Sequence, residues 1–186
     1  MKKNLRNGLI LAIVAVLIVG VFIVKKVSEA NVAEQPGTAS ESSGQSGEKG
    51  ALPFEVRGFD LADLKSHGLP VMLDFGSEQC GPCQQMKPDL KQMYEEMQGK
   101  VVIQYTDIWA YTGAADGYPV QVIPTQAFYD AEGKPFLPSD ELREKYGLIL
   151  YYHRDTNEHM FTIHQGPLYA EDMHEIFAEM GVKADD

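Results

Sequence analysis

The longest apolar run of the chain lies near its beginning, at Gly8–Val24, and contains no charged residue. As an α-helix this run would be about 26 Å long, the short end of what crosses a membrane. We predict that residues 1–27 form an uncleaved membrane anchor. The alternative is a cleaved signal peptide, for which Ser28-Glu29-Ala30 is a weak cleavage site. More basic residues precede the run than follow it, so we expect the N-terminus in the cytoplasm and the remaining chain outside.

Residues 28–50 carry no hydrophobic periodicity. They are rich in serine, glycine, alanine, glutamate and glutamine, and they contain too few large apolar residues to build a core. We predict a flexible linker with an average span of roughly 25 Å. The linker would tether a domain formed by residues 51–186 near the membrane surface.

A short apolar stretch followed by an amphipathic pattern defines the centre of the predicted domain. Val71–Phe75 is apolar except for Asp74, and we predict a buried strand there. After Cys80, apolar residues recur at spacings of three and four, which predicts a helix. These residues are Met86, Leu90, Met93 and Met97. Cys80 therefore lies where a strand turns into a helix, whose free N–H groups and dipole stabilise a thiolate.

Three more elements are predicted between residues 59 and 133. They are a short helix at 59–67, a strand at 101–105 and a strand at 125–130. Asp130–Gly133 is typical of a turn.

The segment between the second and third strands, residues 109–119, has a weaker pattern. Gly113, Gly117 and Pro119 interrupt it, so we expect a short helix and a loop. Trp109 begins this segment. We expect its side chain to pack in the core, and a surface position near Cys80 is the alternative.

The C-terminal part predicts a helix, a hairpin and a final helix. Ser139–Leu142 is typical of a helix N-terminus. Strand-like runs at 148–153 and 160–164 flank the turn candidate Asp155–Glu158. Residues 169–180 have one apolar face, which predicts the last helix.

Acidic residues outnumber basic ones by 27 to 16, and the formal net charge is −11 at pH 7. The acidic excess lies after Gly50, in the predicted domain. This charge therefore disfavours a nucleic acid or an anionic lipid surface as the partner of this domain.

The chain has two cysteines, Cys80 and Cys83, separated by two residues. A structural zinc site normally needs four ligands, and no second cysteine pair or suitably spaced histidine pair completes one. His153, His159 and His164 have alternating apolar neighbours, as in a hairpin, and we expect no metal. An inert disulfide would close so small a loop that it would add little stability. Thiol–disulfide exchange is the interpretation that we favour.

Cys80-Gly81-Pro82-Cys83 resembles the active-site motif of the thioredoxin family. Asp74, six residues before Cys80, resembles the buried strand aspartate of that family, and Ile123-Pro124-Thr125 resembles its cis-proline segment. The resemblance covers roughly Phe54 to Met180. It implies a thioredoxin-like α/β fold, with a central mixed β-sheet flanked by helices.

Three features depart from the family pattern. Gln79 precedes Cys80 where thioredoxins carry tryptophan, and Val101–Tyr105 lacks the lysine that thioredoxins keep as a partner for the aspartate. The chain also has an insert at about 134–159, which we interpret as a helix and an extra strand before the last core strand. We expect the insert to cover a sheet edge, and contact with substrate is the alternative.

The resemblance implies a role for each residue of the motif. Cys80, exposed at the helix end, would attack a partner disulfide, and the more buried Cys83 would resolve the mixed disulfide. Asp74 would take or supply the Cys83 proton. Substrate binding would involve Gly81, Pro82, Ile123, Pro124 and Thr125. No organic cofactor is expected, because the cysteines themselves cycle.

The Gly-Pro pair between the cysteines is typical of reducing thioredoxins. The resemblance therefore favours a protein-disulfide reductase that receives electrons from a membrane thiol carrier, and the predicted topology would place it outside the cytoplasmic membrane. The single-pass topology and the lack of other cysteines favour a bacterial protein. A disulfide oxidase or isomerase is the first alternative. The second is a tethered binding module that recognises a partner through the Pro124 groove without turnover, and the presence of both cysteines argues against it.

Overall fold

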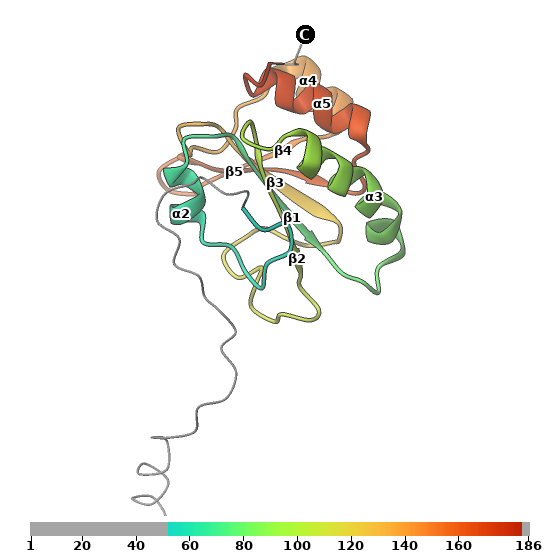
Figure 1. Ribbon diagram of the computed structural model, residues 1–186. Helices are drawn as coiled ribbons and strands as arrows, with labels where there is room; N and C mark the ends of the chain where they lie inside the picture. Colours follow the sequence, from blue (N-terminus) through green and yellow to red (C-terminus); the bar gives the residue numbers. More distant parts are fainter. Residues whose placement is uncertain (1–51, 184–186) are drawn as a thin grey trace, which may run out of the picture. The chain divides into compact units, whose positions relative to one another are not determined.

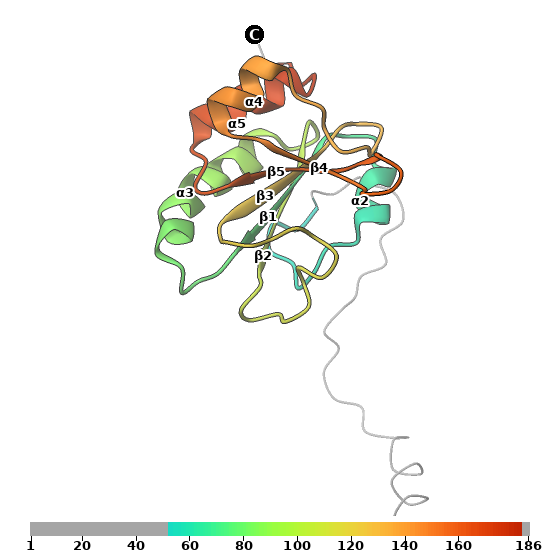
Figure 2. The ribbon, with the colours of Figure 1, turned by 180° about the vertical axis from the view of Figure 1, so that it is seen from behind.

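The computed structural model describes residues 52–183, and Figures 1 and 2 show the arrangement of their helices and strands. The predicted anchor and linker lie outside these residues, so both stay predictions. Within residues 52–183, no helix is long and apolar enough to cross a membrane.

A five-stranded mixed sheet with the order β2-β1-β3-β5-β4 forms the centre of the domain. The interior strand β1 (Val71–Gly76) pairs in parallel with β2 (Val102–Asp107) and antiparallel with β3 (Thr125–Tyr129). β5 (His159–Gln165) lies antiparallel between β3 and the edge strand β4 (Ile149–Tyr152). Every residue of β1 is buried, as its apolar sequence predicts.

Helices cover both faces of this sheet (Figures 1 and 2). α3 (Gly81–Glu96) and α5 (Ala170–Glu179) lie on one face, together with α4 (Asp140–Tyr146), and α2 (Leu61–Ser66) lies on the other. The apolar positions predicted for α3 are buried against the sheet and against α5. The predicted mixed sheet flanked by helices is therefore confirmed.

The alternation of side chains along β1 decides what each face of the sheet carries. Met72 belongs to the core under α3 and α5, whereas Leu73 and Phe75 belong to the core under α2. Side chains two residues apart in a strand point to the same face. Asp74 therefore lies on the α3 side, the side of Cys83.

The predicted insert forms a helix and an extra strand, α4 and β4, before the last core strand β5. Ser139 caps α4, because its Oγ accepts a hydrogen bond from the Leu142 N–H at 3.2 Å. Ser139 Oγ also donates to Glu179 Oε2 at 2.8 Å, which ties α4 to the end of α5. Strand β4 forms the edge of the sheet beside β5.

The helix predicted within residues 109–119 is wrong. These residues form successive turns, several of them closed by a bond between residues three apart, such as Ala114 N–H to Tyr111 O at 3.1 Å. Gly113 and Gly117 have φ values of 93° and 84°, which a right-handed helix cannot accommodate. The two glycines therefore divide the segment into turns.

Candidate active site

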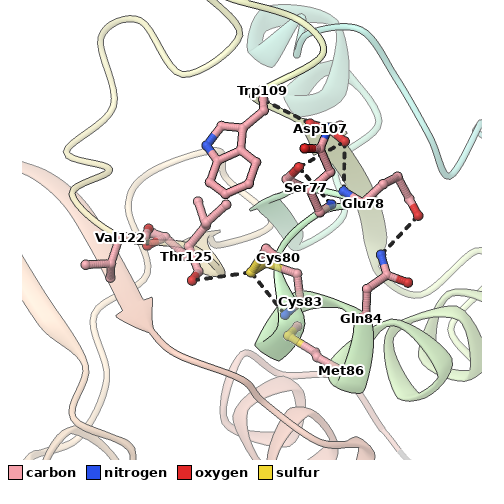
Figure 3. The surroundings of a disulfide bond; sticks show 12 residues. Ser77, Glu78, Cys80, Cys83, Gln84, Met86, Asp107, Trp109, Val122 and Thr125 are labelled. Carbon is pink, nitrogen blue, oxygen red and sulfur yellow. Dashed lines mark hydrogen bonds between the residues drawn. A yellow bond between two sulfur atoms is a disulfide. The ribbon is translucent and has the colours of Figure 1, made fainter.

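The two cysteines form a disulfide at the N-terminus of α3 (Figure 3). Cys80 is the N-cap residue, and its Sγ accepts a hydrogen bond from the Cys83 N–H at 3.2 Å. Pro82 occupies the first turn, where its missing N–H leaves no helical hydrogen bond unmade. A thiolate on Cys80 would therefore face a backbone donor and the positive end of the helix dipole.

Cys80 is less accessible than the sequence led us to expect. Its exposed fraction is 7 %, close to the 5 % of Cys83, so the prediction of an exposed Cys80 is wrong. The reason is a facing segment, because the carbonyl oxygen of Ile123 lies 3.7 Å from Cys80 Sγ. Gly81 and Pro82, directly after Cys80, are exposed. A substrate would therefore approach the sulfur along Gly81 and Pro82.

The facing segment is the predicted cis-proline segment, Ile123–Thr125. The Ile123–Pro124 peptide bond is cis, as the resemblance implied. Pro124 and Thr125 are buried, and the Pro124 carbonyl accepts a hydrogen bond from the Gly166 N–H at 2.9 Å. The segment is thus fixed to the end of β5 and lies directly beside Cys80.

Asp74 is buried next to Cys83, with an exposed fraction of 2 %. Its Oδ1 accepts a hydrogen bond from Gln126 Nε2 at 2.7 Å. Asp74 Oδ2 and Cys83 Cβ each lie 3.5 Å from the point where a Cβ on Gly76 would stand, so both atoms border the same space beside this glycine. Burial raises the pKa of the Asp74 carboxyl to about 7, although Gln126 and the charge of Lys87 lower it in part. This carboxyl can therefore exchange a proton near neutral pH.

Lys87, on α3, supplies a positive charge on the helix side of Asp74. The sequence showed that β2 lacks the family lysine, and Tyr105 of β2 stands opposite Asp74 in register. The Lys87 ammonium lies 4.6 Å from the centre of the Tyr105 ring and forms ion pairs with Glu55, at 2.8 Å, and with Glu78. The charge that favours ionised Asp74 thus comes from a helix rather than from the neighbouring strand.

Asp107, the last residue of β2, joins two loops beside the disulfide (Figure 3). Its Oδ2 accepts hydrogen bonds from Glu78 N–H at 2.8 Å and Ser77 Oγ at 3.3 Å. Its Oδ1 accepts from the N–H groups of Trp109 and Ala110, both at 2.9 Å. Burial alone would raise the pKa of Asp107, but these hydrogen bonds hold the pKa below its ordinary value. Asp107 therefore fixes the turn at Trp109 to the loop that leads into Cys80.

Trp109 is a surface residue, with 55 % of its area exposed, so the prediction that it packs in the core is wrong. In Figure 3 its indole extends from the end of β2 toward the segment that carries Val122, beside Cys80. Val122 is 52 % exposed and Tyr111 is 38 % exposed. The turn held by Asp107 keeps Trp109 at the surface. Apolar surface therefore adjoins the disulfide, and the surface position of Trp109 is the alternative that the sequence left open.

Within residues 52–183, no group of three or more histidine, cysteine, aspartate or glutamate side chains is placed to hold a metal ion. His159 and His164 lie on β5, as the predicted hairpin requires. His164 Nδ1 donates a hydrogen bond to the carbonyl oxygen of Tyr146 at 2.7 Å.

The structure brings the predicted site residues together at one end of the sheet, and their catalytic and binding roles stay predictions. A mixed sheet that presents a two-cysteine disulfide at a helix N-terminus, opposite a cis-proline, defines the thioredoxin-like class of proteins. The family model described as Thioredoxin matches residues 56–151, and the chain belongs to the thioredoxin family.

Curated relatives match parts of the chain. Thioredoxin Y of Oryza sativa, a chloroplastic protein, is 36 % identical over 72 residues, which are 39 % of this chain and 42 % of the relative. Thioredoxin 1 of Chlorobaculum tepidum is 33 % identical over 61 residues, or 33 % of this chain and 60 % of the relative. The mitochondrial thioredoxin of Mus musculus is 41 % identical over 56 residues, or 30 % and 34 % of the two chains. The chain thus spans between 34 % and 60 % of the length of these relatives.

Two solved structures are similar to this one. Chloroplastic thioredoxin z aligns with a TM-score of 0.46 and 20 % identity, over 69 % of this chain and 93 % of its own. Thioredoxin f from spinach chloroplast aligns with a TM-score of 0.38 and 27 % identity, over 44 % and 73 % of the two chains.

Proposed function

We propose that the protein is a thiol–disulfide oxidoreductase that reduces disulfides of other proteins outside the cytoplasmic membrane. The observation that carries the proposal is the Cys80–Cys83 disulfide at the N-terminus of α3, set between the buried Asp74 and the cis-proline segment. Membership of the thioredoxin family supports exchange chemistry at this pair.

The first half of the reaction uses Cys80. In the reduced protein, the Cys83 N–H and the α3 N-terminus stabilise the Cys80 thiolate, which attacks one sulfur of a substrate disulfide. A bond forms between Cys80 and that sulfur, the substrate disulfide breaks, and the other substrate sulfur leaves as a thiolate. An extended substrate segment would lie along Ile123–Thr125 and pair with its backbone.

The second half uses Cys83 and Asp74. The Asp74 carboxylate takes the proton of the Cys83 thiol, directly or through water, and the resulting thiolate attacks Cys80 Sγ. The intramolecular disulfide forms, the mixed disulfide breaks, and the second substrate thiolate leaves. Two electrons have then passed from the two cysteines to the substrate. A dithiol donor must then supply two electrons to restore the reduced pair, and the proton held by Asp74 returns to Cys83.

The direction and location of the reaction rest on sequence features. Gly81 and Pro82 between the cysteines favour the reducing direction through the family resemblance. The predicted anchor at residues 1–27 and the linker at 28–50 would hold the domain at the outer side of the membrane. Such an arrangement needs another redox protein as the electron donor, and the family resemblance suggests a membrane thiol carrier.

Cysteine variants of the full-length chain test the chemistry in an insulin-reduction assay with a thiol reductant. Cys80→Ser should abolish turnover, and Cys83→Ser should accumulate a mixed disulfide with the substrate, seen as a reducible shift on a non-reducing gel. A Cys83→Ser protein that stays fully active would contradict the proposed division of labour. Absence of turnover in the unaltered protein, with any reductant, would favour the tethered binding module.

The location is tested by adding protease to intact bacterial spheroplasts that express the full-length chain. Digestion of the domain without lysis would support the extracytoplasmic proposal. Digestion only after lysis would overturn it.

A further inference from the structure

Four polar residues lie side by side across the sheet. They are Tyr105 on β2, Asp74 on β1, Gln126 on β3 and His164 on β5, each paired in register with the next. Residues that are paired in register point to the same face of a sheet. This face is the one that carries the apolar core under α3 and α5, which includes Met72 and Met86. A polar row in this position calls for a specific reason.

We propose that Gln126 is a positioning residue that orients the Asp74 carboxylate toward Cys83. Gln126 is fully buried, with an exposed fraction of 0 %. Its Nε2 donates to Asp74 Oδ1 at 2.7 Å and lies 3.5 Å from Met86 Sδ. Its Oε1 is buried and has no hydrogen-bond partner in the described part of the chain.

The hydrogen bond from Gln126 distinguishes the two oxygens of Asp74. Oδ1 is engaged by the amide, whereas Oδ2 lies 3.5 Å from the point where a Cβ on Gly76 would stand, and Cys83 Cβ lies at the same distance from that point. The amide therefore fixes the rotation of the carboxylate and leaves Oδ2 as the oxygen available to the Cys83 proton. Because an N–H donor stabilises the ionised form, the same bond offsets part of the cost of burying that charge.

Other charged and titratable groups also face Asp74. Lys87 and Cys83 lie on α3, and Tyr105 lies on β2, where burial raises the pKa of its hydroxyl above the ordinary value. Lys87 is itself paired with Glu55 and Glu78, outside the core. Gln126, which is uncharged, donates a hydrogen bond directly to the carboxylate, so its removal should act on the ionisation of Asp74.

A purely structural role for Gln126 would predict that its replacement lowers the melting temperature, which is the opposite of what we expect. A buried amide with an unpartnered Oε1 carries a desolvation cost that an apolar side chain of the same length avoids. Replacing Gln126 by methionine should therefore leave the melting temperature unchanged or raise it. The ionisation of Asp74 should respond in the opposite sense and become less favourable.

The test is a pH titration of the Asp74 side-chain carboxyl by 13C NMR in the full-length, oxidised protein. Gln126→Met should lower the ionisation constant of Asp74 by about tenfold, because the donor to the carboxylate is lost. The matched control is Gln104→Met on β2, the strand on the other side of β1. Gln104 is also a buried glutamine, but its amide donates to the Pro53 carbonyl, at 3.2 Å, and should leave Asp74 unchanged.

A second variant, Gln126→Glu, keeps the shape of the side chain and covers the case in which Gln126→Met fails to fold. Two carboxyl groups would then meet in the core and share one proton, so one of them should titrate well above pH 7. An Asp74 titration that neither variant moves would overturn the proposal.

The inference rests on the proposed function, because it assigns Gln126 to proton transfer from Cys83. The two can fail separately. If the unaltered protein shows no insulin reduction, the proposed function fails. The titration still decides whether Gln126 controls the ionisation of the Asp74 carboxyl. If turnover is present, the pH at which mixed-disulfide release reaches half its maximum should rise in Gln126→Met and stay unchanged in Gln104→Met.

Discussion

Asp74 links the stability of the domain to its proposed chemistry. Burial raises the pKa of its carboxyl from 3.8 to about 7, and Gln126 and Lys87 lower it only in part. Between these two values the folded protein keeps a proton that the unfolded chain releases, so the free energy of unfolding falls as pH rises. Below about pH 4 Asp74 causes no loss of unfolding free energy, and above about pH 7 the loss is complete.

Asp74→Asn should therefore stabilise the oxidised protein at high pH. The gain should approach about 4 kcal/mol at pH 9, since each pKa unit corresponds to about 1.4 kcal/mol, and it should vanish near pH 3. Urea unfolding at several pH values measures it. Equal gains at pH 4 and pH 9 would contradict the assignment of the shift to this carboxyl.

Trp109 offers the largest exposed apolar side chain beside Cys80, so it should contact substrate. Trp109→Ala should raise KM for a protein substrate by roughly fivefold to tenfold, with little change in melting temperature, because over half of the side chain is exposed. Steady-state insulin reduction measures this effect.

The control is Tyr152→Ala, which removes an aromatic side chain that is 49 % exposed on the edge strand β4. An unchanged KM there is expected if the insert only covers the sheet edge. A rise equal to that of Trp109→Ala would mean that the insert contacts substrate.

At the scale of elements, β1, β2 and α3 converge on Gly76. A Cβ at this position would stand 2.8 Å from a ring carbon of Tyr105 and 3.5 Å from Cys83 Cβ. The first distance is too short for two carbon atoms. The close approach of the three elements therefore depends on a residue without a side chain.

Gly76→Ala should push Tyr105 away from β1 and disturb the start of α3. We expect a loss of about 1–3 kcal/mol of unfolding free energy, the usual cost of overpacking a core, together with reduced turnover. Gly58→Ala is the control, because a Cβ there meets no atom within 4 Å. Equal losses in the two variants, measured by urea unfolding, would show that the contact at Gly76 is not responsible.

Most elements could be predicted from the sequence because their signals are local. The apolar run of β1, the spacing of Met86 and Leu90 in α3, and the capping signature at Ser139 each act within one element. The turns at 109–119 could not be predicted in the same way. The positive φ values of Gly113 and Gly117, rather than hydrophobic spacing, decide their course.

The residues of the site also fall into two groups, those that a local pattern reveals and those that only the fold brings together. Cys80, Cys83 and Pro124 belong to short motifs that can be found in one sequence. Gln126 and Lys87 reach Asp74 only through strand register and helix docking, which local patterns do not specify. The low exposure of Cys80 also depends on a distant segment, because the Ile123 carbonyl covers it.

At the scale of the whole molecule, charge and topology constrain the partners. A net charge of −11, with its acidic excess in the domain, disfavours contact of the domain with an anionic lipid surface. The predicted linker, with an average span of roughly 25 Å, would let the domain move near the membrane surface. A membrane thiol carrier would then have to reach Cys80 along Gly81 and Pro82.

The reduction potential of the Cys80–Cys83 couple shows whether the protein delivers electrons to disulfides. Equilibration of the full-length protein with defined thiol buffers gives this value. We predict a potential near the reducing end of the thioredoxin range, about −270 mV. A potential near about −120 mV would contradict the account, because such a couple donates disulfides instead of reducing them.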